Sequence, residues 1–256
     1  MRLKNKIAIV TGAANGIGLS ITEAFINEGA TVFMADIDAE KLKAEAERFN
    51  SVSLCTHAVV CDVGNTDDVG NLINEIIMQY NRIDIIVNNA AVAIGGNIKD
   101  MPENDWDKLM NTNLKSVYRT IKLVMPHMLK QKRGSIINMS STQAFRSWDN
   151  WTAYAAAKGA MLAMTNQLAG QFGKDNIRFN SISPGAILTP MNEKRVEIEG
   201  PGFLKSSIGQ HAIERMGTPE EVAMTAVFLA SDESAFITGV DIKVDGGLCT
   251  LPRYIE

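Results

Sequence analysis

The 256-residue sequence has few cysteines, no long apolar run and no block of basic charge. Three cysteines form an odd, sparse set that is typical of reduced thiols. No apolar run approaches the roughly 18 residues that span a membrane, and a net charge of −4 gives nucleic acid nothing to attract. The charged start, Met1 to Lys6, runs directly into a predicted strand and leaves no room for a signal peptide. We therefore expect a cytoplasmic protein without membrane or nucleic-acid partners.

A metal site is also not expected. Cys55, His57 and Cys61 alternate along a segment that is predicted to be a strand, Val52 to Asp62, and no second cluster completes four ligands. Ordinary strand residues are the favoured interpretation.

The remainder of the sequence alternates apolar strands with amphipathic helices, and 46% of its residues are hydrophobic. Near-continuous apolar strands are typical of a parallel sheet that is covered on both faces. The predicted strands are Lys6 to Val10, Thr31 to Ala35, Val52 to Asp62, Ile83 to Val87, Ser135 to Met139, Ile177 to Ile182 and Gly239 to Val244.

The helix predicted at Thr66 to Tyr80 shows the pattern between these strands. Its apolar residues recur at i, i+3, i+4 and i+7, and Thr66 is the expected cap. Repeated strand–helix units predict an α/β fold: one doubly wound, Rossmann-like domain over residues 1–256, with a parallel seven-stranded sheet and helices on both faces. The segment Thr189 to Met216 breaks the alternation and lacks a clean period. We expect a substrate lid there, at about 189–216, in preference to an irregular surface excursion.

A glycine-rich turn, Thr11 to Gly18, follows the first strand and opens a helix. Such a turn lets the backbone approach a pyrophosphate, which the helix N-terminus then holds. Asp36, 18 positions beyond Gly18, ends the next strand at the spacing expected for a carboxylate on the adenosine ribose. That carboxylate would repel the 2′-phosphate of NADP, and no Arg or Lys lies in Ala13 to Asn15 or at Ile37. The sequence predicts NAD as cofactor, although Asp36 could instead cap a helix beside Asp38.

Tyr154-Ala-Ala-Ala-Lys158 places a phenol and an ammonium at i, i+4 on one helix face. A tyrosine with a pKa of about 10 is a poor base at neutral pH, and a nearby ammonium would lower that pKa. We expect this pair to supply general acid–base catalysis.

These motifs together resemble the short-chain dehydrogenase/reductase family, in its NAD-preferring form. The turn has the spacing G-x-x-x-G-x-G, Asn88-Asn89-Ala90-Ala91 is similar to the family's N-N-A-G, and Pro184-Gly185 with Thr189 is similar to its P-G-x-x-x-T. Ala91 replaces the family's glycine. The predicted cofactor-binding residues are Gly12, Asn15, Gly16, Ile17, Gly18, Asp36, Ile37, Asp62, Val63, Asn89, Ala90, Ala91, Tyr154, Lys158, Pro184, Gly185, Ile187 and Thr189.

The resemblance also implies a catalytic set of Asn113, Ser141, Tyr154 and Lys158. It assigns Ser141, rather than Ser140, to hydrogen-bond the substrate oxygen. It implies that Asn113 disturbs its helix and holds a water that links Lys158 to solvent.

Substrate residues are expected after Ser141, at Gln143, Trp148 and Trp151, beside Tyr154. Two tryptophans among hydrogen-bonding groups suit a hydroxylated ring such as a sugar, although they could equally pack the loop.

Three functions remain open. The first is an oxidoreductase that moves a hydride between NAD(H) and a secondary alcohol or ketone, such as a sugar or polyol. The second is a 3-oxoacyl-thioester reductase, which Asp36 disfavours because such enzymes usually use NADPH. The third is a non-catalytic dinucleotide-sensing protein. The resemblance further implies a homotetramer, with interfaces at Asn104 to Gln131 with Tyr154 to Phe172, and at the C-terminal strand with a tail that includes Leu251 and Tyr254.

Overall fold

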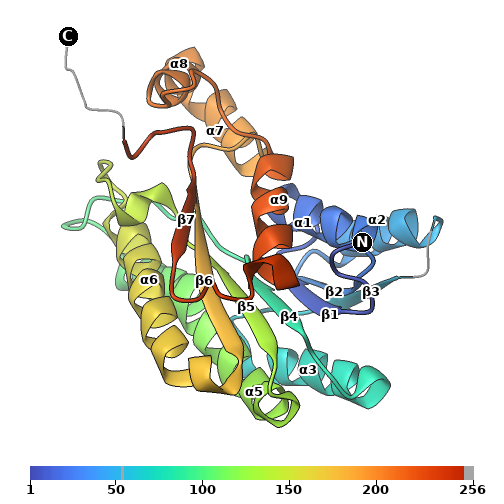
Figure 1. Cartoon of the computed structure of the whole chain (residues 1–256). Coiled ribbons are helices and arrows are strands. Elements are labelled where there is room, and N and C mark those ends of the chain that lie inside the picture. Colours follow the sequence, from blue (N-terminus) through green and yellow to red (C-terminus); the bar gives the residue numbers. More distant parts are fainter. Residues whose placement is uncertain (53–54, 251–256) are drawn as a thin grey trace.

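A seven-stranded parallel sheet forms the centre of the protein (Figure 1). The computed structural model describes residues 1–52 and 55–250, and within them the strand order is β3-β2-β1-β4-β5-β6-β7. Its strands are β1 (Ile7–Thr11), β2 (Thr31–Asp36), β3 (Thr56–Val60), β4 (Ile85–Asn88), β5 (Gly134–Met139), β6 (Ile177–Pro184) and β7 (Asp241–Val244). This confirms the predicted fold class. The order reverses between β1 and β4, which is where open α/β sheets bind ligands.

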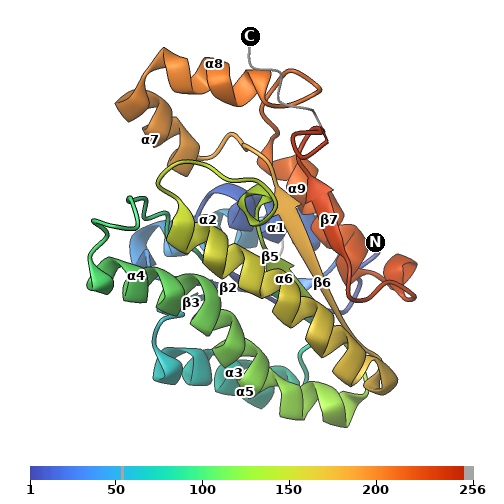
Figure 2. The ribbon, with the colours of Figure 1, turned by 90° about the vertical axis from the view of Figure 1, so that its left-hand side faces the viewer.

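Helices cover both faces of this sheet (Figures 1 and 2). One face carries α1 (Gly16–Asn27), α2 (Ala39–Asn50) and α9 (Pro219–Ala230), and the other carries α3 (Thr66–Tyr80), α5 (Ser116–Gln131) and α6 (Thr152–Phe172). The remaining α-helices are α4 (Glu103–Met110), which leads into α5, and α7 (Pro190–Glu199) and α8 (Pro201–Gly209). Figure 2 shows α7 and α8 beyond the C-terminal end of β6.

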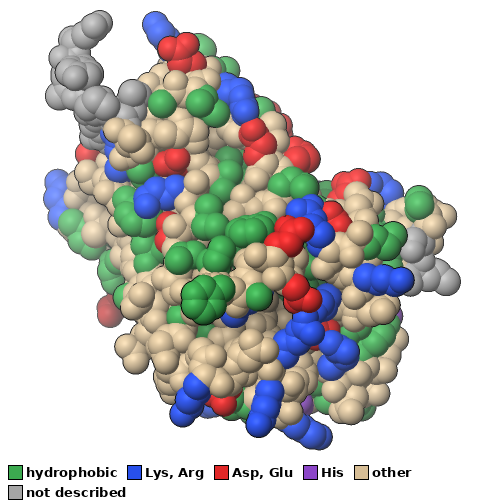
Figure 3. All heavy atoms as spheres, viewed as in Figure 1, with side chains coloured by type: hydrophobic (Ala, Val, Ile, Leu, Met, Phe, Trp, Pro, Cys, Tyr) green, Lys and Arg blue, Asp and Glu red, His purple; other side chains and the backbone are tan. Residues whose placement is uncertain are grey.

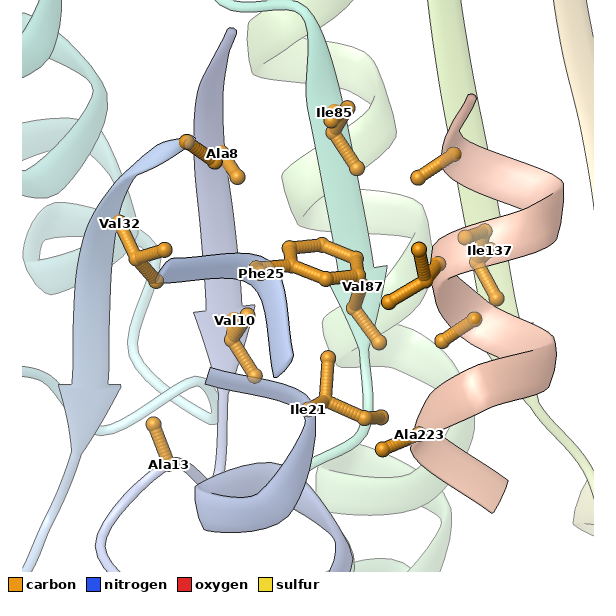
Figure 4. Packing of buried hydrophobic residues seen from close by; sticks show 14 of the residues in the cluster. Ala8, Val10, Ala13, Ile21, Phe25, Val32, Ile85, Val87, Ile137 and Ala223 are labelled. Atoms are coloured by element: carbon orange, nitrogen blue, oxygen red, sulfur yellow. The ribbon is translucent and has the colours of Figure 1, made fainter. Parts of the chain in front are cut away.

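The core divides into two layers because successive strand residues point to opposite faces. Figure 4 shows Val10, Val32 and Val87 facing α1 and α9, where they pack with Ile21 and Phe25. The alternate residues, including those at positions 9, 33 and 86, pack under α3, α5 and α6. This double coverage explains why the strands read as continuous apolar runs.

Two local predictions were wrong. The strand predicted over Val52 to Asp62 is shorter, Thr56–Val60, because Val52 still belongs to the turn after α2. The cap of α3 is Asn65, whose side chain accepts a hydrogen bond from the Asp67 N–H at 2.9 Å. Asn65 has the extended backbone that a cap requires, whereas Thr66 is already helical.

The segment predicted as a lid, 189–216, lacks a clean apolar period in the sequence, yet it contains the helices α7 and α8. Thr189 caps α7, Pro190 and Pro201 begin the two helices, and Gly200, with φ of 78°, separates them. No residue of α7 whose side chain the structure describes is buried, which removes the apolar period that would have revealed it. Its movement as a lid stays a prediction.

His57, which was considered as a metal ligand and disfavoured, lies in an aromatic contact. The His57 ring stacks on Phe33 at 4.3 Å, and its Nε2 lies 2.9 Å from the Tyr80 hydroxyl. Residues 1–52 and 55–250 contain no group of three ligands placed to hold a metal, and no helix among them is long and apolar enough to cross a membrane. Leu251 and Tyr254 lie outside the described residues.

Candidate active site

One cavity of about 1150 Å³ lies at the C-terminal ends of the central strands, beside α7 and α8. Its lining includes the predicted substrate residues, all predicted cofactor residues except Gly18, and all predicted catalytic residues except Asn113. The volume suits a dinucleotide together with a small substrate.

The turn between β1 and α1 forms a glycine cradle at one side of the cavity. Gly12 and Gly16 have φ of 66° and 55°, a backbone region that side chains disfavour. A Cβ on Gly18 would lie 2.0 Å from the Gly12 carbonyl oxygen, so Gly18 is needed for packing beneath the turn. The Asn15 side chain does not cap α1, and the N-terminus of this helix borders the cavity. These features fit a diphosphate.

Asp36 ends β2 and faces the same cavity. Its Oδ2 accepts a hydrogen bond from the Ala14 N–H, and its Oδ1 accepts one from the Asp38 N–H, both at 3.0 Å. Asp38, not Asp36, caps α2, so the alternative capping role for Asp36 was wrong. Further along this end, the cavity is lined by Ile37, Asp62, Val63, Asn89, Ala90 and Ala91.

Asn89 connects the segment after β4 to the glycine turn after β1. Its Nδ2 donates to the carbonyl of Thr11 at 2.9 Å and to that of Gly12 at 3.2 Å. The side chain therefore holds the glycine turn in place, as well as bordering the cavity.

The loop after β6 is held by a histidine that the sequence did not reveal. His211, which follows α8 and is 2% exposed, accepts the Ala186 N–H at its Nε2 (3.1 Å). Its Nδ1 then carries the proton and donates to the Ser207 carbonyl at 2.6 Å. The histidine thus ties the end of α8 to the Pro184–Thr189 loop.

Tyr154 and Lys158 lie side by side on α6, as predicted. The Lys158 Nζ is 5.5 Å from the centre of the Tyr154 ring and donates to the Met139 carbonyl at 2.6 Å. Ser141, just after β5, hydrogen-bonds the Tyr154 phenol. The Ser140 hydroxyl instead donates to the Lys158 carbonyl at 3.0 Å; the choice of Ser141 for the substrate oxygen stays a prediction.

The electrostatics of the pair differ from the sequence prediction. Burial raises the pKa of Tyr154 to about 12, and the hydrogen bond from Ser141 only partly opposes this effect. Burial also lowers the pKa of Lys158 to about 8. Lys158 was expected to lower the pKa of Tyr154, but its ammonium is directed to the Met139 carbonyl, and burial dominates.

Asn113 lies in a π-helical turn, Asn111–Lys115, between α4 and α5. Its side chain is 1% exposed, accepts from the Val92 N–H at 2.8 Å and donates to the Val92 carbonyl at 2.9 Å. The helix is disturbed at the expected position, and the side chain fixes the segment after β4. Its role in holding a water stays a prediction.

Aromatic residues form the far end of the cavity. The Trp151 ring meets the Tyr154 ring edge to face, with centres 5.6 Å apart. Trp148 and Gln143 also line the cavity. The Gln143 Oε1 atom is buried and has no hydrogen-bond partner among the described residues.

The fold and the site define an oxidoreductase that uses a nicotinamide dinucleotide. A family model described as enoyl-(acyl carrier protein) reductase matches residues 12–249. The chain is 39% identical to the 3-oxoacyl-[acyl-carrier-protein] reductase FabG of Thermotoga maritima, over 97% of this chain and 99% of the relative. It is also 39% identical to dehydrogenase/reductase SDR family member 6 of Xenopus laevis, over 96% and 98%.

Solved structures agree with these relatives. A protein from Agrobacterium tumefaciens, described provisionally as a gluconate dehydrogenase, superimposes with a TM-score of 0.94 at 27% identity, over 98% of each chain. The chain belongs to the short-chain dehydrogenase/reductase family.

Proposed function

We propose that the protein transfers a hydride between NAD(H) and the secondary alcohol or ketone of a small hydroxylated compound such as a sugar or polyol. The observation that carries the proposal is the Ser141–Tyr154 hydroxyl pair beside Lys158, in one cavity with the glycine cradle. The buried Gln143 Oε1 supports a substrate with more than one hydroxyl.

In this proposal each side chain has a separate task. When bound, NAD supplies the carbon that accepts the hydride and a positive charge beside the phenol. Ser141 and Tyr154 hold the substrate oxygen while its charge changes. Tyr154 takes the hydroxyl proton during oxidation and returns it during reduction. Lys158 keeps a positive charge next to the phenolate and steadies the strand end through Met139.

NAD is proposed over NADP because of Asp36. Its carboxylate borders the cavity, where it can accept hydrogen bonds from ribose hydroxyls and would repel a 2′-phosphate. Among the described residues that line the cavity, none is a lysine or arginine of α2, and Lys41 of that helix lies 3.6 Å from the Asp38 carboxylate.

Replacing Tyr154 with phenylalanine tests the catalytic role. We expect Tyr154→Phe to bind NADH normally, measured by fluorescence, and to lose about 10²–10⁴-fold in kcat, because the proton acceptor is gone. Tyr118→Phe, at a half-exposed position of α5, should keep full activity. Activity of Tyr154→Phe close to that of the unchanged enzyme would refute the proposal.

A second candidate is a 3-oxoacyl-thioester reductase, which the identity with the Thermotoga maritima FabG favours. Reduction of acetoacetyl-CoA separates the two candidates. Under our proposal its turnover with NADH or NADPH is far slower than oxidation of the best polyol with NAD.

We also propose a cytoplasmic homotetramer. None of the three cysteines, all of which lie in the described part of the chain, forms a disulfide bond, which suits a reducing compartment. Figure 3 shows hydrophobic side chains gathered around α9 and β7, where Met224, Phe236 and Val240 are exposed. Such an apolar patch beside an edge strand suits contact with another subunit.

A further inference from the structure

The lid helices carry charges of both signs, but they present only one of them to the cavity. α7 and α8 contain Glu193, Lys194, Arg195, Glu197 and Lys205. Of the charged side chains that the structure describes on these helices, Arg195 alone lines the cavity. Positive and negative charges nearly balance in the sequence of these helices. The sequence therefore could not show that a positive charge alone faces the cavity.

An aromatic contact fixes Arg195 at the substrate end. The Arg195 guanidinium carbon lies 5.0 Å from the centre of the Trp151 ring. The same indole meets the Tyr154 ring at 5.6 Å. The Trp151 indole therefore lies between the Arg195 guanidinium and the Tyr154 phenol. A substrate of a few carbons can reach both groups.

The other charged residues of the cavity do not compete for this position. Lys158 donates to a backbone carbonyl beneath Tyr154. Lys108 lies one turn before Asn111, whose amide contacts the turn after β3, so Lys108 belongs to the adenosine end. Asp149 lines the cavity from an exposed loop position, where water screens its charge.

We propose that Arg195 binds a carboxylate of the substrate, which makes the substrate a small hydroxy acid. This inference rests on the proposed function, because the secondary hydroxyl of the acid must meet Ser141 and Tyr154. The planar guanidinium can donate two parallel hydrogen bonds to a carboxylate. A further hydroxyl of the acid then meets the polar side chain of Gln143, which lines the cavity.

Matched pairs of substrates test the inference. The purified enzyme is assayed for NAD reduction with D-gluconate and D-sorbitol, and with 3-hydroxybutyrate and butane-1,3-diol. We expect kcat/KM to be at least about tenfold higher for the better acid than for its neutral counterpart, because only the acid makes the charge-assisted bond.

Variants then assign that preference to one side chain. Arg195→Gln should lower kcat/KM for the acid at least about tenfold, mainly through KM, and should lower it by a clearly smaller factor for the neutral compound. Arg195→Lys should keep part of the preference. Lys194→Gln, at the exposed neighbouring position, should keep all of it.

The contrary outcomes are distinct. Equal turnover of acid and neutral compounds by the unchanged enzyme overturns the inference alone, and so does an equal loss for both in Arg195→Gln. An enzyme that binds NADH but oxidises no member of any pair contradicts the proposed function and the inference with it. The comparison in the unchanged enzyme does not depend on the stability of a variant.

Discussion

Burial opposes ionisation of the Tyr154 phenol more than the hydrogen bond from Ser141 favours it. Burial raises its pKa to about 12, and Lys158, with a pKa lowered to about 8, bonds to a carbonyl instead of the phenol. A phenol in this environment is a proton donor at neutral pH, which suits ketone reduction. Oxidation needs added positive charge beside the phenol, and the nicotinamide ring of NAD⁺ carries such a charge.

Under the proposed function, cofactor choice also depends on a single residue, Asp36. Replacing Asp36 with asparagine removes the charge and keeps an oxygen that can accept one of the two backbone N–H groups. We expect Asp36→Asn to lower the ratio of kcat/KM for NAD to that for NADP at least about tenfold, because the repulsion of the 2′-phosphate is lost.

The control for this change lies two residues away. Asp38→Asn keeps a cap for α2 and does not border the cavity, so its cofactor ratio should match that of the unchanged enzyme. A ratio that stays constant in Asp36→Asn would show that Asp36 does not select the cofactor.

At the scale of elements, α8 is tied to the loop after β6 through His211. His211→Phe keeps the ring but leaves the Ala186 N–H without its acceptor, and we expect a loss of about 1–3 kcal/mol in the free energy of unfolding. The KM for NAD should rise, because this loop borders the cofactor site.

Denaturant unfolding and steady-state kinetics measure the two effects. Lys205→Ala, on the exposed side of the same helix, should change neither quantity. Unchanged stability and KM in His211→Phe would mean that the histidine does not hold the loop.

Elements with a buried face were predictable from the sequence, and elements without one were not. β1 and β4 are covered on both sides, so their apolar runs are clear. α7 buries little and gave no period. Thr189 was predicted only as a cofactor residue, and its role as the N-cap before Pro190 became visible only in the structure. His211 follows that segment, so nothing in its surroundings indicated a buried contact.

Some features of the candidate site were likewise predictable from the sequence, and others were not. The glycine turn, Asp36 and the Tyr154–Lys158 pair were predicted because their spacing alone places them together. The direction of the Tyr154 pKa was predicted wrongly, because burial depends on surrounding elements that the spacing does not specify. The charges of α7 have both signs, so the position of the helix was likewise needed to show that Arg195 faces the cavity.

At the scale of the whole molecule, the exposed apolar residues near β7 predict assembly. Light scattering should give a particle of about four times the 27.9 kDa chain mass. Phe236, fully exposed, should anchor one contact, and Phe236→Ser should reduce the particle mass to about half.

A matched change at the other end of the sheet serves as control. Met78 is also highly exposed, but it lies on α3, away from β7. Met78→Ser should leave the mass unchanged. A monomer in the unchanged protein, or a full-sized particle in Phe236→Ser, would exclude this interface.

The placement of tryptophan in this molecule has a practical result. Only three tryptophans occur in the chain, and two of them, Trp148 and Trp151, border the cavity. Indole emission overlaps the absorption band of a reduced nicotinamide, so a ligand of that kind would quench much of the intrinsic fluorescence. The enzyme thus carries its own optical reporter, and titrations of any variant can be followed without a label.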